Sequence, residues 1–220
     1  MPESQAIPPR QPVTLRPRTL LRILATAAFV MLLAECLRIF VGSNFFAVVP
    51  GKCYRSAQPT AKSLASAQRA YGIRTIINLR DENPDDAWYQ EEEKAAKRLG
   101  VTLVNAGLST SEQAPAEDFS KFVQAMNAAQ EPVLIHCANG NDRSGLASAF
   151  YLLMRTNTSI AETRRQLSMR YGHNPWSKAS CLSRTLDSYE AWLQVNSWGH
   201  NADRLFHWGT QVYRPEKIEQ

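Results

Sequence analysis

The feature that most constrains the fold of this chain is a regular alternation of two residue patterns between residues 45 and 198. Short apolar runs rich in β-branched residues alternate with longer segments whose apolar residues recur at helical spacing. These are the patterns of strands and amphipathic helices. A chain that crosses over a helix between two strands lays those strands side by side in parallel. We therefore predict an α/β fold with a central, mainly parallel sheet flanked by helices.

The limits of the expected elements come from residues that start or stop helices. Thr60 can cap one helix, and Asp85 or Asp86 can cap the next, which ends at residue 99. Gly72 and Gly100 stand where these two helices end, as glycine often does. The expected strands are residues 45–50, 52–55, 75–79, 101–105 and 132–135, and the other expected helices are residues 60–71, 115–129, 143–155, 160–171 and 181–198.

Composition sets limits on the class of protein. The chain has 220 residues, of which 44% are apolar, and this suits one ordinary domain with a buried core and some residues left over. Four cysteines in this length exclude a disulfide-dense scaffold. The net charge is +5, but residues 1–41 hold five arginines against two glutamates, which leaves only +2 for the other 179 residues. We therefore predict no nucleic-acid partner.

An apolar stretch at residues 20–41 predicts one transmembrane helix before the domain. As a helix these residues would be about 33 Å long, against about 30 Å for the hydrocarbon core of a bilayer. Glu35 and Arg38 interrupt the stretch at a spacing that lets them pair or reach the interface. The preceding residues 1–19 are rich in Pro and Arg and lack apolar periodicity. We expect them to form a disordered basic tail.

Three interpretations of this stretch compete: an uncleaved signal anchor, a cleaved signal peptide, and a buried helix of a soluble protein. We favour the anchor because no convincing cleavage site follows, and Glu35 stands where a lipoprotein-like site needs a small residue. Four arginines precede its charge-free part, so the positive-inside rule places the N-terminus in the cytoplasm. Basic residues just beyond the stretch weaken this bias. We predict a single-pass protein of a bacterial inner membrane, with its folded domain on the periplasmic side.

The residues that carry chemistry are concentrated in the run 136–145, between a buried strand and an apolar helix. A loop of this kind directs backbone N–H groups inward and adds the positive potential of a helix N-terminus, so it binds anions. A cysteine in such a loop, here Cys137, has its thiolate stabilised. Arg143 can return over the loop and bind two oxygens of a tetrahedral anion. Gly140 and Gly145 permit a sharp turn and a close backbone approach.

This run resembles the Cys-x5-Arg-Ser/Thr signature of the protein tyrosine phosphatase superfamily, with His136 before it and Gly140 inside it. Two upstream segments, residues 54–59 and 72–80, resemble the opening segments of compact dual-specificity-type phosphatases of bacteria, fungi and plants. The resemblance covers about residues 45–190. It implies a dual-specificity phosphatase-like fold, with the phosphate loop at the C-terminal edge of the sheet.

The resemblance leads to a division of the chain. We expect residues 43–198 to form the phosphatase domain and residues 199–220 to be a C-terminal tail. The aromatic side chains near this end are expected to pack on the domain or to rest at a membrane interface. They are Trp192, Trp198, Phe206, Trp208 and Tyr213.

The resemblance also implies roles for the residues of the run. Cys137 would attack phosphorus and form a phosphocysteine that water then hydrolyses, with Arg143 holding the equatorial oxygens. His136 would orient the loop and support the thiolate, and Ser144 would hydrogen-bond the sulfur. The alternative, a structural cysteine beside a surface arginine, is disfavoured because all these residues occur together between a strand and a helix. No metal or cofactor is expected. The residues expected to bind phosphate are Ala138, Asn139, Gly140, Asn141, Asp142 and Arg143.

The residue that protonates the leaving group is left open between two acids. Relatives often carry this acid on the loop before a following helix, which is here residues 106–114, and Glu112 is the only acid in it. Asp142 is the favoured candidate, because Gly-x-Asp-Arg resembles the loop of myotubularin-type and some bacterial phosphatases. In the alternative interpretation, Asp142 forms a salt bridge that positions Arg143 and Glu112 is a solvated carboxylate.

The sequence thus predicts a cysteine-dependent phosphatase of the protein tyrosine or dual-specificity type, acting on a phosphorylated protein or a small phosphomonoester. Two alternatives remain: a phosphatase of a lipid, inositol or envelope glycan phosphate, and a pseudophosphatase that binds phosphorylated partners. Asn139 and Asn141 stand where phosphoinositide-type relatives often carry lysines, which disfavours a polyphosphorylated inositol. His173 is interpreted as a structural loop residue that could line the pocket. Cys53 and Cys181 could form a disulfide in an oxidising compartment.

Overall fold

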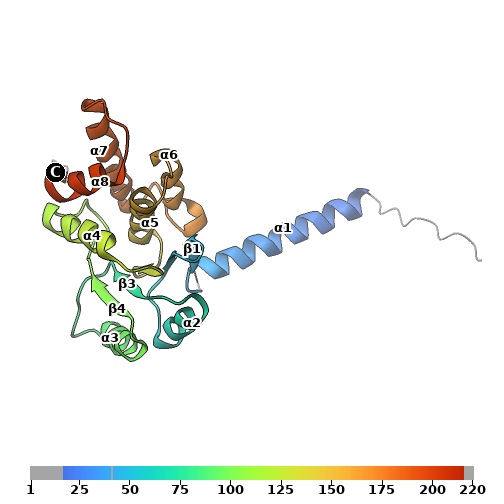
Figure 1. Ribbon diagram of the computed structural model, residues 1–220. Helices are drawn as coiled ribbons and strands as arrows, with labels where there is room; N and C mark the ends of the chain where they lie inside the picture. The colour runs from blue at the N-terminus through green and yellow to red at the C-terminus, as the bar shows by residue number, and fades with distance from the viewer. Residues whose placement is uncertain (1–16, 41, 216–220) are drawn as a thin grey trace, which may run out of the picture. The chain divides into compact units, whose positions relative to one another are not determined.

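The computed structural model describes residues 17–40 and 42–215, and the chain divides into two compact units, residues 1–37 and 38–220. Helix α1 (Pro17–Phe40) contains all the described residues of the first unit, and its last three residues belong to the second unit (Figure 1). Its part Pro17–Leu37 is long and apolar enough to cross a membrane, with a mean hydropathy of 2.1. Length and composition alone support this span, and a signal sequence would meet the same criteria. Residues 1–16 of the expected basic tail lie outside the described residues.

The second unit is built on a five-stranded sheet with the strand order β1-β2-β5-β3-β4 (Figure 1). Strand β1 pairs with β2 in antiparallel fashion, and every other pair is parallel, as the alternating sequence pattern predicts. All residues of β2, β3 and β5 are buried because helices cover both faces of the sheet. The strands are β1 (Phe46–Val49), β2 (Cys53–Ser56), β3 (Thr75–Asn78), β4 (Thr102–Asn105) and β5 (Val133–His136).

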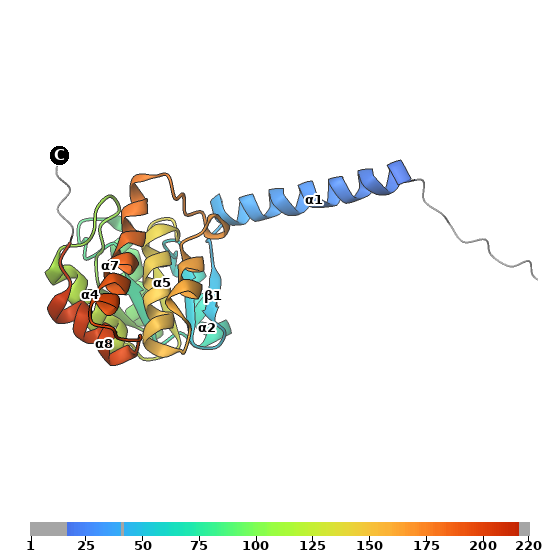
Figure 2. The same ribbon diagram turned by 90° about the horizontal axis from the view of Figure 1, so that it is seen from above.

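Two layers of helices cover this sheet. On one face α2 (Ala61–Tyr71) and α3 (Ala87–Leu99) enclose a small core that includes Leu64, Ile76 and Leu134. The larger core lies on the other face, where α5 is buried along nearly its whole length beside its neighbours (Figure 2). The helices of this face are α4 (Ala116–Ala128), α5 (Asp142–Arg155), α7 (Cys181–Val195) and α8 (Ala202–His207).

The caps in the structure agree with the expected ends of α2 and with the expected end of α3, whereas Asp86 stands at the N-cap position of α3 without a capping hydrogen bond from its side chain. The hydroxyl of Thr60 accepts a hydrogen bond from the N–H of Ser63, and the Ser63 side chain in turn accepts from the N–H of Thr60. Gly72 and Gly100 end α2 and α3 in the left-handed conformation, both at φ 66°. These are local signals, so they could be found in the sequence.

The segment at residues 160–171, expected to be one helix, is broken. It contains a short helix α6 (Ile160–Thr163) and two 3-10 turns, η1 (Arg164–Gln166) and η2 (Met169–Tyr171). The cause is tertiary contact. The guanidinium of Arg55 binds the Gln166 carbonyl, and Gly145 packs so closely on that carbonyl that a Cβ would lie 2.7 Å from its oxygen. Such contacts override helix propensity.

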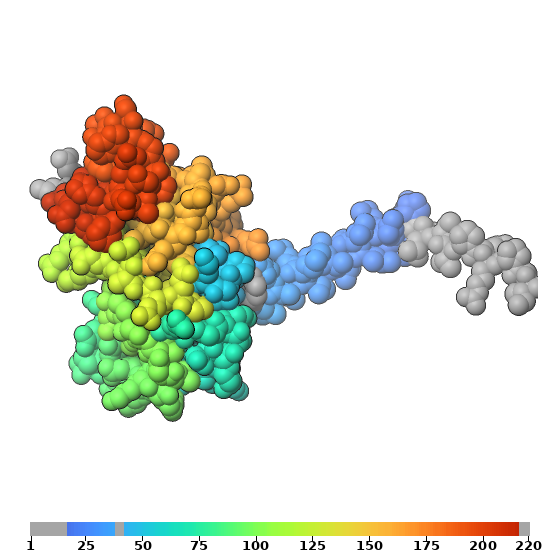
Figure 3. Space-filling view, viewed as in Figure 1, coloured from blue at the N-terminus to red at the C-terminus, as the bar shows by residue number. Residues whose placement is uncertain are grey.

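The C-terminal segment is part of the domain core. Helix α8 and the following π-helical turn η4 (Trp208–Val212) bury Leu205, Trp208 and Tyr213, and the hydroxyl of Tyr213 donates to the Ala114 carbonyl at 2.9 Å. In the space-filling view this red segment lies directly on the rest of the domain (Figure 3). The expected boundary at residue 198 therefore falls too early, because the aromatic rings beyond it complete the core. Their packing on the domain agrees with one of the two placements expected for them.

Candidate active site

The loop that follows β5 wraps around the sulfur of Cys137. This side chain is only 4% exposed, and the N–H of Gly140 donates to its Sγ at 3.2 Å. Gly140 has φ +73°, and a Cβ there would lie 2.6 Å from the backbone nitrogen of Ala57. Only glycine suits this position, for two reasons: it adopts the positive φ easily, and it leaves room for the backbone at the end of β2 to approach closely. The loop lies at the C-terminal edge of the parallel strands, as the resemblance implies.

Asn44 holds the loop from outside. It is fully buried and has a left-handed backbone (φ 45°), which asparagine tolerates. Its Nδ2 donates to the Asn139 carbonyl at 3.0 Å, the Asn141 Oδ1 at 2.8 Å and the Tyr171 carbonyl at 3.1 Å. Sequence reasoning did not find this residue, because its partners are about a hundred residues away along the chain.

Arg55 holds the loop from the same outer side. Its guanidinium is fully buried, with Nη2 donating to the carbonyls of Gly140 at 2.9 Å and Asn141 at 2.7 Å. Nη1 binds Gln166, and the ring of Tyr171 lies 4.3 Å from the Cζ. Burial lowers the pKa of Arg55 to about 10. The nearby charge of Cys137 has the opposite, smaller effect and raises this pKa. A buried arginine needs this many partners, so an arginine in the apolar strand pattern of residues 53–56 was a usable signal.

These contacts orient the backbone of the whole loop. The carbonyls of residues 138–141 are all bound from outside, since the N–H of Gln58 donates to the remaining one, Ala138, at 3.2 Å. In a trans peptide the C=O and the next N–H point in opposite directions. The N–H groups of residues 139–142 therefore point away from these donors, and that of Gly140 meets the Cys137 sulfur. This inward row of N–H groups can bind an anion.

Arg143 and Ser144 open α5 beside this row. The Nη1 of Arg143 donates to the Leu79 carbonyl at 2.9 Å and lies 3.5 Å from that of Leu108, which orients the guanidinium along the neighbouring loops. Burial first, and then the charge of Arg143, lower the pKa of Arg80. The buried hydroxyl of Ser144 lies 3.5 Å from the Ser56 carbonyl. The expected contact with the sulfur is absent from the hydrogen bonds of the described residues.

His136 meets a buried acid that sequence reasoning missed. Its Nε2 lies 2.7 Å from Oε1 of Glu92, and both side chains are fully buried. The Nε2 of Gln58 donates to the other oxygen of Glu92 at 3.0 Å, and Arg80 donates to Gln58 in turn. The signal lay in α3, where Glu92 shares a buried face with Tyr89, Ala95 and Ala96.

The two acid candidates are placed differently. Asp142 stands in the loop, and its Oδ1 lies 2.7 Å from Nδ1 of the buried His173. The expected alternative partner, Arg143, instead binds the two carbonyls named above. Glu112 is exposed on the loop before α4, where its N–H donates to the Ser109 hydroxyl at 3.3 Å.

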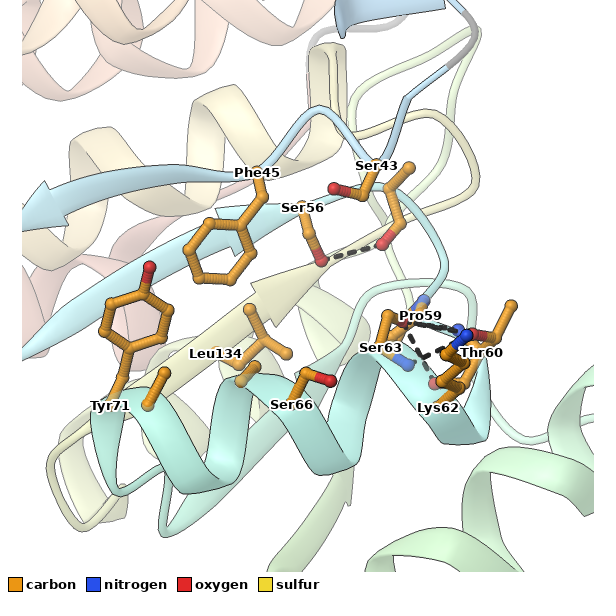
Figure 4. A pocket seen from close by; sticks show the side chains of 13 residues that line it. Ser43, Phe45, Ser56, Pro59, Thr60, Lys62, Ser63, Ser66, Tyr71 and Leu134 are labelled. Carbon is orange, nitrogen blue, oxygen red and sulfur yellow. Dashed lines mark hydrogen bonds between the residues drawn. The ribbon is translucent and has the colours of Figure 1, made fainter.

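The other cysteines and a neighbouring cavity complete the surroundings. All four cysteines are free thiols, and burial raises the pKa of Cys53 and of Cys181. Among the described residues, no group of three or more His, Cys, Asp or Glu side chains could hold a metal ion. A cavity of about 510 Å³ lies between α2, the segment before β1, and strands β2 and β5, with Phe45 and Tyr71 at one end and hydroxyls at the other (Figure 4). It adjoins the loop through Ser56 and Ala57, but Cys137 and Arg143 do not line it.

Comparison with solved structures supports the fold. A crystal structure of a DUF442 protein of Shewanella putrefaciens superposes with a TM-score of 0.55, at 21% identity, over 72% of this chain and 92% of that one. The crystal structure of Pseudomonas aeruginosa TpbA has a TM-score of 0.51 at 23% identity, over 69% of this chain and 91% of that one. At these identities the likeness concerns the fold alone.

Sequence comparison identifies the family. The dual specificity protein phosphatase TpbA of P. aeruginosa is 33% identical over 102 residues, 46% of this chain and 43% of that protein. The inositol diphosphatase SIW14 of Saccharomyces cerevisiae is 28% identical over 105 residues, 46% of this chain and 36% of that one. The chain thus spans less than half the length of either relative. The model of the family described as "DSP-PTPase phosphatase fused to NAD+ Kinase" matches residues 50–183. Because this match covers more than half of the chain, the chain belongs to this DSP-PTPase phosphatase family.

Proposed function

We propose that the protein hydrolyses phosphate monoesters through a phosphocysteine on Cys137. The observation that carries the proposal is the orientation of the catalytic loop, residues 136–143. Four of its carbonyls are bound from outside, so the N–H groups of residues 139–142 line the side where the sulfur lies. Such a row binds the equatorial oxygens of a phosphoryl group and stabilises the charge that develops on them.

The proposed reaction has two steps. The Cys137 thiolate attacks phosphorus in line with the leaving oxygen, while Arg143 and the loop N–H groups hold the other oxygens. Asp142 donates a proton to the leaving oxygen as its bond to phosphorus breaks. Water then attacks the phosphocysteine, Asp142 takes the proton from it, and the sulfur leaves. Glu112 remains the alternative proton donor, although its exposed position gives it less support.

The proposed substrate is a phosphorylated protein or a small phosphomonoester. The printed name of TpbA describes a dual specificity protein phosphatase, and that of SIW14 an inositol diphosphatase. The loop side chains that face outward here are neutral. Asn141 is engaged with Asn44 and the Gly172 carbonyl, and Asn139 carries no charge to meet a second phosphate. This favours a substrate with a single phosphate over a polyphosphorylated one.

The test is turnover of an aryl phosphate by the full chain in detergent. We expect hydrolysis that vanadate blocks and a chelator does not affect, and a loss of more than about a thousandfold in kcat for Cys137→Ser. Cys53→Ser, a buried thiol outside the loop, is the control and should retain activity. Binding of phosphopeptide without turnover would instead identify a pseudophosphatase.

We also propose that α1 anchors the enzyme in a bacterial inner membrane with the domain in the periplasm. Its 24 residues and the mean hydropathy of 2.1 over Pro17–Leu37 support the anchor. We expect the expressed protein to resist alkaline extraction from membranes and to be cleaved by protease added to spheroplasts. Protection until detergent is added would contradict the orientation. A shortened, freely soluble product would instead identify a cleaved signal peptide.

A further inference from the structure

A short segment at residues 166–173 lies against the outer side of the catalytic loop. We call it the bracing segment, and it contains Gln166, the turn η2 and His173. Gln166 and the Tyr171 ring contact Arg55, and the Gly172 carbonyl accepts a hydrogen bond from Asn141 at 3.2 Å. These contacts give the segment a fixed position relative to the loop.

At the end of the bracing segment His173 meets Asp142. The Nδ1 of His173 lies 2.7 Å from Oδ1 of Asp142, with the imidazole 3% exposed and the carboxyl side chain 31% exposed. The backbone fixes the imidazole as well, because Gly172 turns at φ 79° and the N–H of His173 donates to the Ser168 carbonyl at 3.2 Å. A carboxyl held at Oδ1 cannot rotate freely, so Oδ2 is the oxygen left to meet a ligand in the loop.

The chemistry of an imidazole suits this position. A proton donor must cycle between the acid and the carboxylate, and a permanently charged arginine at hydrogen-bond distance would favour the carboxylate at every stage. A neutral imidazole can donate from Nδ1 to the carboxylate or accept from the acid, according to its tautomer. It can therefore hold Oδ1 in both states of the cycle.

We infer that His173 is a positioning residue that holds Asp142 with Oδ2 directed at the leaving oxygen of the substrate. The inference rests on the proposed phosphatase function and deepens it. In the first step the S–P bond forms, the bond from phosphorus to the leaving oxygen breaks, and the Oδ2 proton moves to that oxygen. In the second step water supplies the new P–O bond, its proton returns to Oδ2, and the thiolate departs.

The experiment compares aryl phosphates whose leaving phenols differ in acidity, since a weakly acidic phenol depends most on a proton donor. We expect Asp142→Asn to lower kcat about 100-fold on phenyl phosphate, and His173→Gln to lower it about 10-fold, in line with typical general acid contributions. On dinitrophenyl phosphate both losses should fall to within about twofold. The double variant should lose no more than Asp142→Asn alone, because the two residues act through one proton.

The variants His173→Asn and His173→Gln distinguish a role in positioning Asp142 from a role only in stabilising the fold. The amide nitrogen of His173→Asn can take the place of Nδ1 and should restore most of the activity, whereas that of His173→Gln reaches the Nε2 position instead. The control is His200→Asn, at another partly buried histidine that binds Tyr189 and the Leu153 carbonyl. It should leave the dependence on the leaving group unchanged.

Several outcomes would overturn the inference. They are equal losses across all leaving groups, a His173→Asn variant as impaired as His173→Gln, or additive losses in the double variant. If the wild type turns over aryl phosphates and Cys137→Ser does not, but neither Asp142→Asn nor His173→Gln alters the dependence on the leaving group, this inference and the role of Asp142 as proton donor fail, while the proposed phosphatase function stands. Absence of turnover in the wild type would instead refute the proposed function.

Discussion

Single residues far from Cys137 in the sequence shape the catalytic loop without needing to touch a substrate. Arg55 shows the physical cost of this arrangement, because moving a charged group out of water costs several kcal/mol. Four hydrogen bonds and the Tyr171 ring offset that cost. Two of these hydrogen bonds go to loop carbonyls. The contacts that compensate for burying the charge of Arg55 therefore also orient the N–H groups of the loop.

Gly140→Ala tests how tightly the loop is packed. The new Cβ would lie 2.6 Å from the Ala57 nitrogen at a positive φ, so we expect loss of phosphatase activity and a lower free energy of unfolding. Gly51→Ala is the matched control, with φ +78° and no atom within 4 Å. It should show only the backbone cost of about 1 kcal/mol and full activity. Thermal unfolding and aryl phosphate turnover measure both, and equal behaviour of the two variants would contradict the close packing.

The site residues divide by how near their partners lie in the sequence. Cys137, Gly140 and Arg143 occupy one loop, and their spacing alone indicated anion binding. Arg55 and His173 bind this loop from 85 and 31 residues away, so no local pattern reveals the contacts. A charged residue within an apolar pattern, such as Arg55 or Glu92, can be noticed in the sequence. The residues that it contacts can be identified only from the folded structure.

At the scale of elements, local signals determined what could be predicted. The β-branched strands and the capped helices α2 and α3 agree with expectation within about a residue or two, since their signals lie within each segment. The segment at residues 160–171 does not, because its conformation depends on Arg55 and Gly145. The unexpected break is what brings η2 and His173 to the catalytic loop.

The contact between α5 and α7 predicts a dependence of stability on pH. His200 joins them, with Nδ1 2.9 Å from the Tyr189 hydroxyl and Nε2 3.1 Å from the Leu153 carbonyl. Burial lowers the pKa of His200 below its ordinary value. The unfolded chain therefore takes up this proton at a higher pH than the folded one, and the stability from this neutral histidine is lost as pH falls below about 6.5.

We expect the free energy of unfolding of the wild type to fall more steeply between pH 7 and pH 5 than that of His200→Asn. Urea unfolding at several pH values measures this difference. His207→Asn, at an exposed histidine on α8, should follow the wild type. Parallel curves for the wild type and His200→Asn would contradict the prediction.

At the scale of the whole molecule, the core of the domain is completed by α8, η4 and Tyr213. Trp208 is 2% exposed and packs on Phe119, Tyr189 and Tyr213, whose rings belong to three separate segments. The aromatic composition of this end was visible in the sequence. Packing on the domain was one of the two placements expected for it, but which elements carry these rings into the core could not be predicted, because a lone π-helical turn and a helix of six residues give no clear periodic pattern.

Trp208→Ala tests this closure. Removing a buried aromatic ring of this size costs about 3–5 kcal/mol, so we expect a large loss of stability with little direct effect on the chemistry of the loop. Trp176→Ala is the matched control, at a side chain 83% exposed, and should change stability by less than about 0.5 kcal/mol. Chemical denaturation gives both values. A Trp208→Ala variant as stable as the control would place η4 outside the cooperative unit.

The burial of the C-terminal segment also bears on the order of events during synthesis. Helix α5, which carries Arg143, is completed by α7, α8 and η4, and these are the last described elements to leave the ribosome. The nascent chain therefore holds the complete sequence of the catalytic loop well before it holds the whole core in which α5 is buried. We expect a nascent chain that has emerged only as far as α6 to bind vanadate poorly, and binding to rise once α7, α8 and η4 have been added. Such a delay would keep the anion-binding loop from taking its final form before the surrounding core exists.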